Sequence, residues 1–95
     1  MITLDSPLFE EILLRSAACR AECDFYGAID LLEKVLPTLD PHCLFNVYHE
    51  LFLAHDQRGD KVMARHYLRK AIEQGGDTEA LRSFIASDHT AIVYN

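Results

Sequence analysis

The sequence has little glycine and proline, no tryptophan and no long apolar run. Four glycines and three prolines are few for an all-β chain of 95 residues, which must turn often, so helices are favoured. No stretch approaches the roughly 18 apolar residues that a membrane span needs. Residues 1–11 lack the basic start of a secretory signal and carry several acidic side chains. We therefore expect a cytoplasmic protein.

An excess of positive charge is also absent. Nine Lys and Arg residues stand against 15 Asp and Glu residues, which gives a formal net charge of −6. A duplex nucleic-acid binder needs a basic stripe to neutralise phosphates, and an anionic membrane attracts basic segments. We therefore expect neither nucleic acid nor a membrane as the partner.

The three cysteines do not form a disulfide framework, because their number is odd and their spacing is irregular. Free thiols of this kind are typical of a reducing compartment. Cys19 and Cys23 are four positions apart, a spacing that can chelate a metal, but a structural zinc site wants four Cys or His ligands in compact pairs. We predict no metal and no cofactor.

Signatures of catalysis are lacking as well. Gly75-Gly76 is not followed by the Lys and Ser or Thr of a phosphate-binding loop. His49-Glu50 lacks the second histidine of the His-Glu-x-x-His zinc motif, since position 53 is Leu53. We predict that the chain is not an enzyme. A metal-dependent or thiol-dependent enzyme, which would need a reactive Cys19, is the alternative from this class.

Signals for helix starts, by contrast, recur along the chain. A capping side-chain oxygen precedes proline at Ser6-Pro7 and at Asp40-Pro41, and Asp24, Asp60 and Asp77 are further candidate N-caps. Pro37, Gly59 and Gly75-Gly76 are stop signals.

Residues at helical spacing between these signals form five stripes. They are Leu8, Phe9, Ile12, Leu13, Ser16, Ala17 and Arg20; Phe25, Ala28, Ile29, Leu32, Val35 and Leu36; Leu44, Phe45, Tyr48, Leu51, Phe52 and His55; Met63, Ala64, Tyr67, Leu68, Ala71 and Ile72; and Leu81, Phe84 and Ile85. Short turns between helices favour antiparallel neighbours. We predict a single all-α domain over residues 1–95, with helix pairs at about 7–36 and 41–74, a capping helix at about 77–87 and a tail at 88–95.

The start signals are spaced regularly. Ser6-Pro7 and Asp40-Pro41 lie 34 positions apart, and Asp24 and Asp60 lie 36 apart. A period of this size is typical of stacked helix hairpins. With these positions the chain resembles the tetratricopeptide repeat, a pair of antiparallel helices of about 34 residues.

The second helices carry most of this resemblance, because the family pattern Ala-x3-Phe-x2-Ala aligns with two segments here. These are Ala28, Leu32 and Val35, then Ala64, Leu68 and Ala71. The first-helix signature aligns with Leu14, Ala17, Ala18 and Ala21, then with Tyr48, Leu51, Phe52 and His55. Phe52 departs from the family, which has a small residue there, and so implies wider helix spacing or a shifted register.

The resemblance implies a right-handed α–α superhelix of two antiparallel hairpins plus a C-terminal capping helix. It also implies a non-enzymatic interaction module, an adaptor or a small chaperone, that holds a partner peptide or helix in a groove lined by the first helix of each pair. The groove positions carried over are Arg15, Cys19 and Glu22 from the first repeat, Asn46, His49, Leu53 and Asp56 from the second, and Ser83 from the last helix.

The alternative is a structural subunit that forms a homodimer or a larger assembly through its C-terminal helix. Two repeats are few for an independent stack, and the last helix and tail carry apolar residues that a short stack can hardly cover. Tyr26 and Tyr94 lie off the apolar stripes and are further candidates for contact with a partner.

Overall fold

The computed structural model describes residues 1–75, and these fold into four α-helices. They are α1 (Pro7–Ala21), α2 (Phe25–Val35), α3 (Leu44–Gln57) and α4 (Lys61–Glu73), with the 3-10 turns η1 (Leu36–Thr38) and η2 (Pro41–Cys43) between α2 and α3. Residues 1–75 contain no strand, so the all-α prediction is confirmed for them. The predicted capping helix and tail, with Ser83 and Tyr94, lie outside the described residues.

Three of the predicted N-caps make the hydrogen bonds expected of them, which explains why α1, α2 and α4 begin where they do. Ser6 accepts from the Leu8 N–H (3.2 Å), Asp24 from the Gly27 N–H (3.0 Å) and Asp60 from the Met63 N–H (3.1 Å). At the capping Asp60 these bonds hold the pKa of the carboxyl below its usual value, chiefly through the backbone N–H and then through Arg58.

The Asp40-Pro41 signal behaves differently from the sequence prediction. The Asp40 carboxylate accepts the N–H of His42 at 2.9 Å and so caps η2, a single 3-10 turn, before α3 starts at Leu44. The helix therefore begins three residues later than the cap-and-proline pattern suggests, because the turn after Pro41 closes with i to i+3 bonds first.

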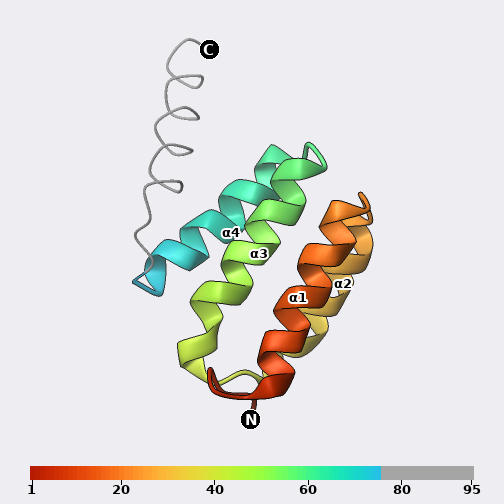
Figure 1. Ribbon diagram of the computed structural model, residues 1–95. Coiled ribbons are helices and arrows are strands. Elements are labelled where there is room, and N and C mark those ends of the chain that lie inside the picture. The colour runs from red at the N-terminus through yellow and green to blue at the C-terminus, as the bar shows by residue number, and fades with distance from the viewer. Residues whose placement is uncertain (76–95) are drawn as a thin grey trace.

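The four helices form two antiparallel hairpins placed side by side (Figure 1). α1 and α3 lie next to each other, α2 lies behind α1, and α4 packs along α3. Helix α3 is central, since it contacts α4 most extensively and also touches α1 and α2. Two antiparallel hairpins that pack side by side are thus present in residues 1–75.

The core lies between the hairpins and is almost wholly apolar. Three alanines of the α3–α4 pair, Ala54, Ala64 and Ala71, are fully buried and let the two backbones approach closely. Phe52 is only 5% exposed, so this pair also accommodates the phenyl ring that departs from the family pattern.

The N-terminal segment ties the two hairpins together through its backbone. The Ile2 N–H donates to the Thr38 carbonyl and the Asp40 N–H donates to the Ile2 carbonyl, both at 2.7 Å. The buried Cys43 thiol donates to the same Ile2 carbonyl at 3.5 Å. These bonds fix the linker between α2 and α3, and with it the direction in which the second hairpin leaves the first.

The two interhelix turns have the same design with different residues. The Asp24 N–H reaches back to the Cys19 carbonyl (2.8 Å) as the Asp60 N–H reaches back to the His55 carbonyl (2.9 Å). This closure needs a left-handed residue just before each aspartate. Gly59 fills the place in the second turn with φ 89°, whereas Cys23 fills it in the first with φ 61°.

We predict that Cys23→Gly raises the free energy of unfolding by about 1 kcal/mol, because glycine adopts the left-handed conformation without the steric cost of a Cβ. The matched change Gly59→Ala should lower it by a similar amount. Urea denaturation followed by circular dichroism measures both. A destabilised Cys23→Gly variant would contradict the equivalence of the two turns.

Candidate functional site

Helix α1 is apolar on two sides, and only one of them is buried. Phe9, Ile12 and Ser16 face the core. The opposite side, named here the exposed apolar face, consists of Leu14, Ala17, Ala18 and Ala21. Leu14 is 64% exposed. The structure therefore exposes the four residues that the family alignment assigns to the first-helix signature, and it buries the neighbouring stripe instead.

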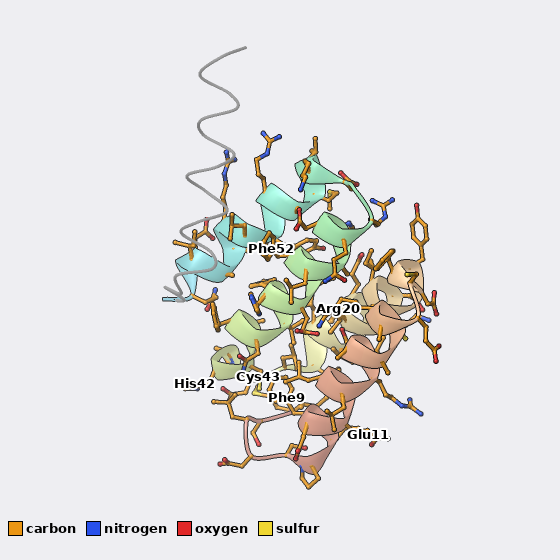
Figure 2. All side chains as sticks on the ribbon, turned by 45° about the horizontal axis from the view of Figure 1, so that its top comes forward. Phe9, Glu11, Arg20, His42, Cys43 and Phe52 are labelled. Carbon is orange, nitrogen blue, oxygen red and sulfur yellow. The ribbon has the colours of Figure 1, made fainter. Side chains whose placement is uncertain are left out.

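A polar network between α1 and α3 fixes this arrangement (Figure 2). Glu50 of α3 accepts a hydrogen bond from the Ser16 hydroxyl at 3.1 Å and pairs with the Arg20 guanidinium at 3.1 and 3.4 Å. The side chains of Arg20 and Glu50 are only 16% and 15% exposed, and Ser16 is fully buried. An ion pair so shielded from water depends on its partners, because either charge left alone would be costly.

The network and the buried side chains of Phe9 and Ile12 together set the rotation of α1 about its axis. Successive residues of an α-helix lie about 100° apart, so turning Ser16 and Arg20 toward α3 turns Leu14 and Ala18 toward solvent. In Figure 2 Arg20 points into the space between α1 and α3, whereas Glu11 lies on the far side of α1. The sequence signal for this network is the presence of Ser16 and Arg20 within an otherwise apolar stripe.

The predicted site residues of α1 do not lie on the side that meets α3. Arg15 is exposed and pairs with Glu11 of its own helix at 3.8 Å. Glu22 is exposed at the C-cap of α1, and Cys19 is half-buried against the core. By helical geometry, the exposed Ala17 is the α1 residue that lies one turn before Arg20, next to it on the solvent side.

The predicted site residues of α3 lie together on one side of that helix. Asn46, His49, Leu53 and Asp56 are all half-buried. Their spacing of three and four residues places them on one strip of the helix surface. Leu53 packs against the core, and Asp56 forms an ion pair with Lys61 at the start of α4.

His49 is the aromatic centre of this strip. Its ring stacks on Phe45 at 6.0 Å between ring centres and meets Phe52 at 6.2 Å. Burial lowers the pKa of His49, the Arg20 guanidinium lowers it further, and Glu50 acts in the opposite direction. The imidazole is therefore neutral at pH 7 and presents an aromatic surface with hydrogen-bonding nitrogens.

A second histidine, His55, is buried between α3 and α4. Its ring stacks on Tyr67 with 5.5 Å between ring centres and an interplanar angle of 11°. Neither ring nitrogen has a hydrogen-bond partner within residues 1–75. Burial lowers the pKa of His55, assisted by Arg58, against the opposing charges of Asp60 and Glu33. The neighbouring Asp56 pairs with Lys61.

Tyr26, a candidate for partner contact, is held by the opposite turn. The Arg58 guanidinium donates to the Tyr26 hydroxyl at 2.6 Å and lies 4.6 Å from the centre of the ring. Arg58 also pairs with Asp60 at 2.7 Å, so the contact joins the first turn of α2 to the N-cap of α4. Tyr26 remains 70% exposed, but part of its surface serves the fold.

Other kinds of site leave no trace in the part of the chain that the structure describes. Residues 1–75 bring together no group of three or more metal-ligating side chains, and Cys19, Cys23 and Cys43 are free thiols. None of the four helices has the length and apolar content to cross a membrane. Comparison with protein-family models, with curated proteins and with solved structures finds no match.

Glu50→Ala is predicted to lower the free energy of unfolding by about 2 kcal/mol, because it strands the Arg20 guanidinium and the Ser16 hydroxyl in a shielded position. Glu11→Ala, which breaks the exposed pair with Arg15, is the matched control and should cost under about 0.5 kcal/mol. Equal effects of the two substitutions in urea denaturation would show that the network does not hold α1 in place.

Stability should fall as the pH drops below about 6.5, where histidines in the unfolded chain take up protons. The pKa values of His55 and His49 are lowered in the folded state, so the unfolded state binds more protons there and acid favours unfolding. His55→Phe keeps an aromatic ring against Tyr67 and should reduce this pH dependence. The free energy of unfolding is measured between pH 5 and 7.5 for the unsubstituted chain and for His55→Phe. An equal pH dependence in the two would contradict the assignment of this effect to His55.

Proposed function

We propose that the chain is a non-enzymatic interaction module that binds another polypeptide across α1 and α3. The observation that carries this proposal is the exposed apolar face of α1. A helix that is apolar on both sides is normally covered on both sides, and uncovered apolar patches mark sites of interaction. The described chain covers one side of α1 and leaves the other to a partner.

The strip on α3 extends this surface. Ala17 and Ala21 flank Arg20, whose partner Glu50 is in turn next to His49 on α3. Beyond that ion pair lie the stacked ring of His49 and the half-buried Leu53. A partner that lies across the two helices thus meets alanines and Leu14 first, then the ion pair, then an aromatic and an aliphatic side chain. Apolar anchors with a few fixed polar groups suit recognition of a peptide or a helix.

The finer fold proposed for this function is the tetratricopeptide-like superhelix. Two antiparallel hairpins in series, with α1 and α3 adjacent on one side, support it. The repeated left-handed turns at Cys23 and Gly59 support it too, since they give both hairpins the same closure. In this arrangement α1 and α3 are the helices that line the binding side, and the proposed role is that of an adaptor or a small chaperone.

The test is a variant that changes the exposed apolar face without touching the core. Leu14→Gln with Ala18→Gln replaces two exposed apolar side chains and should leave the unfolding free energy within about 0.5 kcal/mol of the unsubstituted chain. We expect it to lose at least nine tenths of the protein that co-purifies with the unsubstituted chain, because an apolar contact must then bury amide groups.

The matched control is Val62→Gln with Ile72→Gln on α4, two apolar residues that are 72% and 40% exposed. Their replacement should leave the co-purifying protein unchanged. If the unsubstituted chain, the α1 variant and the α4 variant all retain the same amount of co-purifying protein, α1 is ruled out as the binding surface. A loss confined to the α4 variant would move the site to α4.

A further inference from the structure

We infer that the partner binds the exposed apolar face of α1 with an amphipathic helix. This partner helix carries a basic side chain near each end of its own apolar stripe. This inference rests on the proposed function and adds the chemistry of the partner. The reason is which charged side chains of α1 already form ion pairs and which do not. Both cations of the helix are in ion pairs, Arg15 with Glu11 and Arg20 with Glu50. Glu10 and Glu22 have no ion pair within residues 1–75.

These two carboxylates bracket the exposed apolar face. Glu10 and Glu22 are 12 residues apart, which is about 18 Å along a helix, and both are exposed. The apolar residues between them are Leu14, Ala17, Ala18 and Ala21. A partner that buries those residues brings its own side chains close to both carboxylates, and partial exclusion of water strengthens the interaction of opposite charges.

Glu22 also lies at a position where its negative charge destabilises the helix. It lies at the C-cap of α1, where the helix dipole is negative and an anion is unfavourable. A lysine or arginine of a partner at this end would relieve that repulsion. The neutral His49, whose pKa is lowered by burial, adds no positive charge to the surface at pH 7.

The shape of the face favours a helix as the occupant. Alanines at spacings of three and four residues leave a low surface, into which the larger side chains of another helix can pack as ridges into grooves. Leu14 supplies the one large anchor on this side. The expected partner is thus an amphipathic helix of about four turns with bulky apolar residues and terminal Lys or Arg.

A second copy of this chain fits poorly. Two α1 helices pairing through this face would bring carboxylates together, Glu10 against Glu10 in a parallel pair and the Glu10 end against the Glu22 end in an antiparallel pair. The formal net charge of −6 adds to the repulsion. Residues 76–95 of the same chain, with three acidic side chains against Arg82, are no better matched in charge.

The experiment uses three labelled 18-residue helical peptides with one leucine stripe and with lysine, glutamine or glutamate on its flanks. Fluorescence anisotropy with the full chain should show the lysine peptide binding at least tenfold more tightly than the glutamine peptide, and the glutamate peptide most weakly. The preference should shrink in 0.5 M salt, since exposed charges are screened.

Glu10→Lys with Glu22→Lys should reverse the order of the lysine and glutamate peptides. Glu33→Lys with Glu73→Lys, an equal change of net charge at exposed sites on α2 and α4, should preserve it. A lysine preference that survives in the first variant overturns the inference, because it would reflect net charge alone. Equal binding of the lysine and glutamine peptides overturns the inference and leaves the proposed function standing, whereas no binding of any peptide contradicts both.

Discussion

The contact of Ser16 and Arg20 with Glu50 locks one side of α1 against the core. Burial of Phe9 and Ile12 favours the same rotation of the helix, because the opposite side offers only Leu14 and alanines. The shielded ion pair reinforces it, because a rotation that buried Leu14 and Ala18 would separate Arg20 from Glu50 and leave each charge in a poorly hydrated place. The polar contact and the apolar burial here select the same side.

From this rotation follows the surface on which the functional proposals depend. The side that is turned away carries an apolar strip between Glu10 and Glu22, two carboxylates with no ion pair within residues 1–75. The side that is turned inward carries the network itself. On α3 the neighbouring strip holds His49 between two phenyl rings, neutral at pH 7 because burial lowers its pKa. The proposed binding surface therefore lies on α1 and α3, the two helices that the Ser16–Arg20–Glu50 network joins.

Much of the fold could be predicted because its signals are local. Capping residues such as Asp24 and Asp60 accept a hydrogen bond from the N–H three residues later. A left-handed glycine such as Gly59 ends the helix before it. For α1 the periodicity already marks Phe9, Ile12 and Ser16 as one stripe, and these are the residues that the structure buries. The partner of Ser16 could not be predicted with the same local rules, since Glu50 lies 34 residues away. The family positions on α1, Arg15, Cys19 and Glu22, stay a prediction for the binding side. The contact with α3, which the resemblance does not indicate, runs through Ser16 and Arg20.

The most direct test of this account is the solvent exposure of individual methyl groups in the isolated chain. A soluble paramagnetic reagent broadens the NMR signals of methyls that it can approach. The account predicts that methyls of Leu14, Ala17 and Ala18 are broadened as strongly as those of Val62, while those of Ile12 and Ala28 are protected. Protection of Leu14 and Ala18 together with exposure of Ile12 would show that α1 is rotated the other way.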